Sequence, residues 1–326
     1  MKPIRSSCWL VAGIIVCHSL FIFDSSAQSY PVKPVHIFVG FPAGTATDTT
    51  ARMVAQKLPE HLGQPVVVEN RAGASGTIAT AKVATSPADG YTLLLLTAAE
   101  TAQPALRARL PYDLERDLAP VSLVVRATFV LVVHPSVPAR DVRELIALAR
   151  SQTGKLNFAS SGVGSTLHLA GELFNMMAKV NVVHVSYKGA TEAVTATASG
   201  QIDMSFPALS TAAPLLNAGK VRGFAVTSAN RTSLMPSIPT LNESGLPGYE
   251  RSTWFGISAP AGVPKDIIAR LNAVIEKVVN TPEMRESFVK QGLEPQTNSP
   301  EQFAVLIHRG IAQNAELIKF AGMKAE

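Results

Sequence analysis

Two short segments rich in glycine and hydroxyl side chains carry the clearest chemistry in this chain. They are residues 41–48, FPAGTATD, and residues 159–166, ASSGVGST. Each follows a short apolar run and precedes an amphipathic one, which predicts a loop leading from a strand into a helix N-terminus. A helix N-terminus offers unpaired N–H groups and a positive dipole end, and glycine lets an anion approach the backbone. The two loops together indicate a site for a small anion.

Either loop taken alone has a simpler interpretation as a capped turn. Thr47 or Asp48 would cap the first helix, and Ser165 or Thr166 the second, through a side-chain oxygen. The two loops lie about 120 residues apart in the sequence, so we expect them in different domains. A pair of such loops in two domains favours a cleft that holds an anion from both sides.

Signatures of catalysis and of metal binding are weak. The sequence has no G-x-S-x-G, GK[ST] or H-E-x-x-H motif. His168 and Glu172 have the i, i+4 spacing of metal ligands, but no third ligand is suggested nearby. Asp113, Glu115 and Asp117 lie in a polar stretch typical of a solvated turn. We therefore predict no catalytic residue, no metal and no cofactor, and so no enzyme.

The first 27 residues have the pattern of a secretory signal peptide. The pattern consists of a basic start (Lys2 and Arg5), an apolar core (residues 9–16 and 20–23) and a cleavage site of small residues (Ser25-Ser26-Ala27). An uncleaved membrane anchor is the alternative, but Cys17-His18-Ser19 interrupts a stretch already shorter than the ~20 residues of a span. Both cysteines, Cys8 and Cys17, leave with the peptide, so we expect no disulfide.

The elements that must position the two loops alternate between strand and helix patterns. Strands are predicted at residues 35–39, 91–96 and 156–159, and helices at 48–58, 264–279 and 300–320. Repeated strand–loop–helix units favour an α/β fold with largely parallel sheets, whose ligands bind beyond the carboxyl ends of the strands. A length of 326 residues suggests about two domains.

The net charge of the chain is small. It is +5 for the whole sequence, and removing Lys2, Arg5 and Asp24 with the signal peptide leaves +4. There is no cluster of lysine and arginine of the kind that a nucleic-acid-binding face requires. We expect no nucleic-acid partner.

Many short blocks, in order along nearly the whole mature chain, together resemble one known family. They are residues 30–34 (YPVKP), the 41–48 loop, 62–71 (LGQPVVVENR), 89–94 (DGYTLL), 110–113 (LPYD), 119–122 (APVS), 161–165, 168–174 (HLAGELF), 187–189 (YKG), 219–220 (GK), 225–228 (AVTS), 245–249 (GLPGY) and 259–262 (APAG). The sequence is similar to the Bug family of extracytoplasmic solute receptors, the receptor component of tripartite tricarboxylate transporters.

This resemblance implies an α/β, two-lobed periplasmic-binding-protein fold of the Venus flytrap kind, type II-like, with a cleft between the lobes. Domain 1 would comprise residues 28–127 and 253–326, and domain 2 residues 128–252. It also implies a small carboxylate as ligand, the membrane permease subunits of a tripartite transporter as partners, a monomer, and a periplasmic location. The ligand-binding residues carried over from the two loops are Phe41, Ala43, Thr45, Asp48, Ser161, Gly164, Ser165 and Thr166.

Three departures from the family pattern bear on the ligand. Thr45 stands where a second glycine is usual, and a β-branched residue resists a positive φ. Glu100 lies in a stretch that is usually rich in glycine and asparagine, where it would repel an anion or recognise an amine. Pro207-Ala208 replaces a polar pair. Together, the three departures indicate a less polar or amine-bearing carboxylate as the ligand.

Two other functions are possible alternatives. The first is a periplasmic sensor that acts on a signalling partner, and the second, less favoured, is an exported α/β enzyme.

Overall fold

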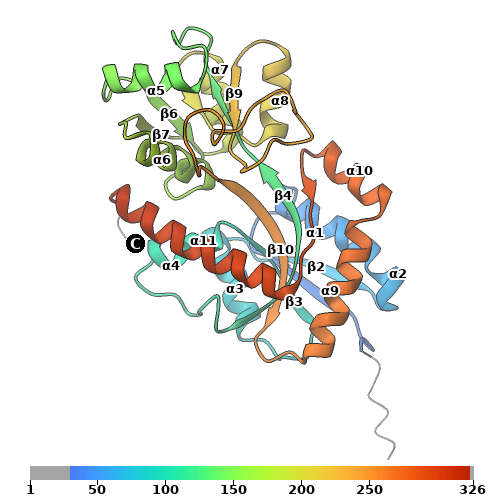
Figure 1. Cartoon of the computed structure of the whole chain (residues 1–326). Helices are drawn as coiled ribbons and strands as arrows, with labels where there is room; N and C mark the ends of the chain where they lie inside the picture. Colours follow the sequence, from blue (N-terminus) through green and yellow to red (C-terminus); the bar gives the residue numbers. More distant parts are fainter. Residues whose placement is uncertain (1–29, 324–326) are drawn as a thin grey trace, which may run out of the picture.

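The computed structural model describes residues 30–323, which form two sheets covered by helices (Figure 1). The predicted signal peptide, residues 1–27, lies outside the described residues. Within them, no helix is long and apolar enough to cross a membrane.

The first sheet has six strands in the order β11-β4-β10-β3-β1-β2. Their bounds are β1 Val35–Val39, β2 Val66–Asn70, β3 Thr92–Thr97, β4 Leu118–Thr128, β10 Ser252–Pro260 and β11 Glu294–Pro295. β1, β2 and β3 are parallel, whereas β10 runs antiparallel to both β3 and β4.

The second sheet has five strands in the order β7-β6-β8-β5-β9. Their bounds are β5 Val130–Val133, β6 Asn157–Ser160, β7 Val183–Ser186, β8 Met204–Ser205 and β9 Arg222–Val226. β6, β7 and β8 are parallel, and β5 runs antiparallel to its two neighbours, β8 and β9. The sequence predicts largely parallel sheets, and this is wrong. Both sheets are mixed, because β10 and β11 run opposite to the other strands of the first sheet and β5 runs opposite to the other strands of the second.

Helices cover both faces of each sheet (Figure 1). On the first sheet, α1, α9 and α10 pack on one face and α3 and α11 on the other. On the second, α5 and α6 oppose α7 and α8. The helix bounds are α1 Ala46–Lys57, α2 Pro59–Leu62, η1 Ala74–Gly76, α3 Thr77–Ala84, η2 Glu100–Ala102, α4 Gln103–Leu106, α5 Val142–Ser151, α6 Thr166–Ala178, α7 Ala190–Ala198, α8 Leu209–Asn217, α9 Lys265–Val279, α10 Pro282–Lys290 and α11 Pro300–Phe320.

Local signals explain where several helices begin and end. Proline cannot continue a helix but fits its first position, so α1 ends at Lys57 and α2 begins at Pro59. α11 begins with a capping box, in which the side chains of Ser299 and Gln302 each bond the other residue's backbone N–H. We call each sheet with its covering helices a lobe. α11 starts in the first lobe, and its C-terminal half packs against α6 of the second lobe through Leu317, Ile318 and Leu169.

Strand β10 has no room for a side chain at Gly256. A Cβ atom there would lie 2.3 Å from the Cζ atom of Phe303, a fully buried residue of α11. We expect Gly256→Ala to lower the free energy of unfolding by about 1–3 kcal/mol, because overpacking forces Phe303 to shift. Urea denaturation measures this. Gly189→Ala, where a Cβ meets no atom within 4 Å, is the control. Equal midpoints for the two variants would contradict the expectation.

Candidate functional site

The topology of the first sheet places residues 41–48 at the edge where the chain crosses between lobes. Val39 at the end of β1 pairs with Leu95 of β3, and Thr97 at the end of β3 pairs with Phe255 of β10. β10 enters the sheet at this edge and β4 leaves it there, since Ser252 pairs with Thr128. The carboxyl ends of β1 and β3 therefore face the second lobe.

The second sheet presents residues 161–165 at its matching edge. β5 begins at Val130, directly after β4, and its Val132 pairs with Ser205 of β8. Ser205 in turn pairs with Ala159 of β6, which runs opposite to β5 and so ends where β5 begins. The two loops thus lie on the facing edges of the two sheets, as a ligand held from both lobes requires.

The first loop is held by one buried carboxylate. Asp48 accepts hydrogen bonds from the backbone N–H of Gly44 at 2.9 Å, from Asn70 Nδ2 at 2.8 Å and from Arg52 Nε at 3.0 Å. Burial alone would raise the pKa of Asp48, but the hydrogen bonds from Arg52, Gly44 and Asn70 outweigh it and hold the pKa below its ordinary value. The side chain of Asp48 therefore fixes the shape of the loop.

Thr45 caps helix α1. Its hydroxyl accepts from the N–H of Asp48 at 3.4 Å and donates to the carbonyl oxygen of Pro42 at 2.8 Å. Its φ of −75° is ordinary, so the strain expected of a β-branched residue is absent. Gly44 takes the positive φ instead, at 80°. With Asp48 N–H satisfied, the N–H groups of Ala46 and Thr47 at the start of the helix have no acceptor among the described residues.

The second loop repeats this arrangement around a histidine. Ser165 caps helix α6 by accepting from the N–H of His168 at 3.2 Å, and Gly164 N–H donates to His168 Nδ1 at 3.0 Å. Gly162 and Gly164 have φ values of 118° and 73°, which only glycine adopts readily. The N–H groups of Thr166 and Leu167 have no acceptor in the described part of the chain.

A second histidine supports the same loop, and sequence reasoning missed it. The rings of His168 and His184 stack with centroids 3.7 Å apart. His184 Nε2 lies 2.6 Å from Ser160 Oγ, and Ser160 Oγ accepts from the N–H of Gly162 at 3.2 Å. Burial, and then the neighbouring His168, lower the pKa of His184 to about 4, so this ring is neutral at pH 7.

The predicted site residues fall into two groups. Phe41, Ala43, Ser161 and Thr166 are exposed or half-buried at the sheet edges, and Gly164 meets the opposite lobe, since a Cβ there would lie 2.8 Å from Leu106 Cδ1. The side chains of Thr45, Asp48 and Ser165 are engaged in capping and loop contacts. The side chains of the second group therefore shape the loops, whereas those of the first group make no such contact.

Glu100 is fully buried at the end of β3. Its Oε2 accepts from the N–H of Thr97 at 3.2 Å and contacts the Thr97 hydroxyl, and Oε1 has no partner among the described residues. Burial raises the pKa of Glu100 to about 8, so the carboxyl is neutral at pH 7. The sequence-based expectation is a charged Glu100 that faces the ligand. The structure gives it neither the charge nor the exposure.

Pro207 and Ala208 follow β8 at the same edge. The carbonyl oxygen of Pro207 accepts from the N–H of Val130, and Ala208 bridges to Phe129. The backbone of this pair therefore holds residues 129 and 130, where the chain enters the second lobe. No group of three or more histidine, cysteine, aspartate or glutamate residues that could hold a metal ion occurs within residues 30–323.

Two mixed α/β lobes, joined by crossing strands and carrying anion-compatible loops on facing edges, define a two-lobed solute-binding protein. Comparison with known proteins identifies the family. Residues 50–323 match the model described as the tripartite tricarboxylate transporter family receptor. The chain belongs to this family, and the resemblance to the Bug receptors is confirmed.

Individual proteins support this membership. BugT of Bordetella pertussis is 34% identical over 96% of this chain and 97% of its own. The solved structure of R. palustris Rpa4515 with adipate is 36% identical, covers 91% of this chain and 100% of its own, and has a TM-score of 0.76. The solved structure of MatC from Rhodopseudomonas palustris with bound malate is 31% identical, covers 89% of this chain and 100% of its own, and has a TM-score of 0.73. The predicted α/β periplasmic-binding-protein fold is confirmed.

The burial of Glu100 predicts a specific pH dependence of stability. In the unfolded chain this carboxyl ionises near pH 4.5, whereas the folded protein keeps it protonated up to about pH 8. Wild-type protein therefore loses stability as the pH rises through this window. Glu100→Gln has a similar shape and cannot ionise, so its Tm should exceed that of the wild type by an amount that grows from pH 5 to pH 8.

Calorimetry at several pH values checks this. Glu276→Gln, which removes an exposed carboxylate on α9, is the control. A Tm difference between Glu100→Gln and wild type that stays constant with pH would contradict the assignment of a neutral, buried carboxyl.

Proposed function

We propose that this protein is a periplasmic receptor that binds a small carboxylate between its lobes and delivers it to the permease subunits of a tripartite transporter. One observation carries the proposal. The 41–48 and 161–166 loops lie on facing sheet edges and each leads into a helix whose first N–H groups lack an acceptor among the described residues. Backbone N–H groups at a helix N-terminus are suited to a carboxylate.

The ligands of relatives point to the same chemistry. The R. palustris relative was solved with adipate and MatC with malate, and both are dicarboxylates. Because Glu100 is neutral at pH 7 and Asp48 is paired with Arg52, neither side chain opposes an anion at the first loop. We therefore propose that the ligand is a small carboxylate without an amine group, in contrast to the amine-bearing carboxylate that the sequence indicates.

Hinge closure is the proposed mechanism. A ligand that contacts both lobes stabilises the arrangement in which they approach, and no covalent step is needed. Phe41 and Ala43 would contact the ligand from the first lobe, and Ser161, Gly164 and Thr166 from the second. Thr45, Asp48 and Ser165 would hold the loops in the shape that aims their N–H groups.

The domain division and the location are proposed together with this function. We assign residues 28–127 and 253–326 to one domain and 128–252 to the other, since the chain passes between the sheets near Thr128 and returns near Ser252. The proposed receptor is a monomer in the periplasm, exported by a signal peptide that is cleaved after Ala27.

Thermal unfolding with a panel of carboxylates tests the function. Residues 28–326, refolded to remove any carried ligand, are melted with aliphatic diacids, hydroxy acids, acidic amino acids and aromatic acids. A ligand present at 100 times its Kd stabilises by about 2.7 kcal/mol, which corresponds to roughly 5 °C. We expect one class to raise the Tm by this amount. Folded protein whose Tm responds to no carboxylate would contradict the proposal.

A substitution at Gly164 tests the placement of the site. Gly164→Val combines a φ of 73° with a clash against Leu106, so we expect the loss of carboxylate binding in a protein that still folds. Gly219→Val is the matched control, because Gly219 has a similar φ of 65°, a Cβ there would have no neighbour within 4 Å, and the residue lies outside both loops. Calorimetric titration measures affinity, and unchanged affinity in Gly164→Val would refute this placement.

A further inference from the structure

A cavity at the hinge brings together three arginines that the proposed carboxylate site does not use. It has a volume of about 60 Å³ and lies where β10 and β4 pass between the lobes, beside α11. Arg126, Arg251 and Arg309 line it, and Glu250 is the one carboxylate among its lining residues. None of its lining residues belongs to the two loops.

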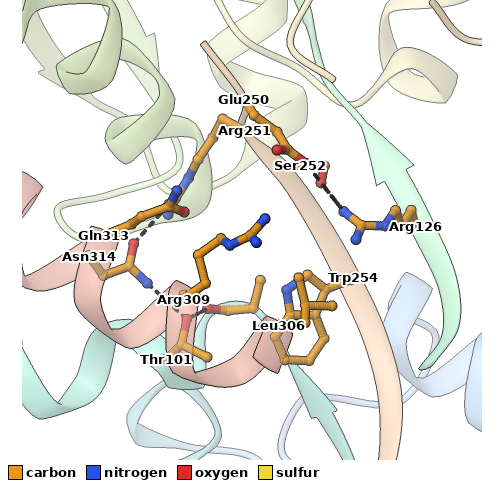
Figure 2. A pocket seen from close by; sticks show the side chains of 12 residues that line it. Thr101, Arg126, Glu250, Arg251, Ser252, Trp254, Leu306, Arg309, Gln313 and Asn314 are labelled. Carbon is orange, nitrogen blue, oxygen red and sulfur yellow. Dashed lines mark hydrogen bonds and ion pairs between the residues drawn. The ribbon is translucent and has the colours of Figure 1, made fainter. Parts of the chain in front are cut away.

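The arginines come from three elements. Figure 2 shows Arg126 on β4, Arg251 just before β10, and Arg309 extending from α11 into the space between them. Arg126 donates to Ser252 Oγ at 3.2 Å, and its Nη1 lies 3.7 Å from Glu250 Oε1. The pKa of Arg126 is lowered chiefly by burial. Glu250 and Glu294 oppose this change and the positive charge of Arg309 adds to it, so the two arginines repel each other.

Arg251 is the buried member of this group. It is 9% exposed, and its Nη1 donates to Asn314 Oδ1 at 2.8 Å, with Asn314 Nδ2 in turn donating to Thr101 Oγ1 (Figure 2). Its Nε is buried and has no acceptor among the described residues. Like charges placed together at a partly buried site are costly. An anion in the cavity offsets the repulsion between Arg126 and Arg309.

We propose that this hinge cavity, which we call the arginine pocket (Arg126, Arg251 and Arg309), binds a small oxyanion. At roughly 10–15 Å³ for each water, a cavity of this size has room for a phosphate, a sulfate or the carboxylate end of a small acid. Guanidinium groups match such oxygens through paired N–H donors. The pocket joins both hinge strands to α11, so its occupancy would be linked to the relative position of the lobes.

Calorimetric titration of residues 28–326 with inorganic phosphate tests the pocket, at constant ionic strength with chloride as the balancing ion. We expect saturable binding in the wild type, at least tenfold weaker binding in Arg309→Gln, and wild-type binding in Lys319→Gln, which removes a cation from the same helix. Arg309 is exposed on α11, and circular dichroism verifies that its variant folds. Arg126→Gln should weaken binding as well.

Further titrations separate the pocket from the two loops. Phosphate binding should persist in Gly164→Val. Acetate titrated in parallel shows whether the pocket also accepts a carboxylate, which Arg309→Gln would then weaken. Absence of phosphate and acetate binding in the wild type, or equal binding in wild type and Arg309→Gln, would overturn the proposal. Either result would leave the proposed function standing, because that depends on the loops.

Discussion

The antiparallel pairing of β4 with β10 is the constraint on which the rest of the structure depends. It runs from Pro260 opposite Leu118 to Ser252 opposite Thr128, so the two chain crossings lie side by side at one edge of the first sheet. Thr227 joins the crossings just beyond, with its N–H and hydroxyl bonded to the backbone of Phe129. Because each lobe's parallel strands end at this boundary, their loops face each other, which is the arrangement that the proposed ligand site uses.

Each lobe prepares its loop with different side chains but by the same physical means. A cap residue, Thr45 or Ser165, takes the third N–H of the helix, and a buried group, Asp48 or His168, takes the N–H of the glycine before the cap. The glycines supply the positive φ values that turn the chain. The loops are thus held in place before any ligand arrives, which reduces the entropy that binding must cost.

Sequence reasoning can predict the elements whose signals are local. Residues 300–320 are predictable as one helix from their start signal and apolar spacing, and Pro59 marks the end of α1. β4 and β10 are not, because their antiparallel partners lie more than 120 residues away and no local pattern shows the pairing. The loops are visible as glycine and hydroxyl residues, but the burial that neutralises Glu100 and the gathering of Arg126, Arg251 and Arg309 depend on contacts between distant segments.

A crystal structure of residues 28–326 with a bound carboxylate would show directly whether both loops hold the ligand. The expected result places the carboxylate oxygens within hydrogen-bond distance of backbone N–H groups at both residues 44–47 and residues 164–167, with Asp48 still bonded to Arg52. A carboxylate found only in the arginine pocket, or on one lobe alone with the opposite loop making no contact, would contradict it.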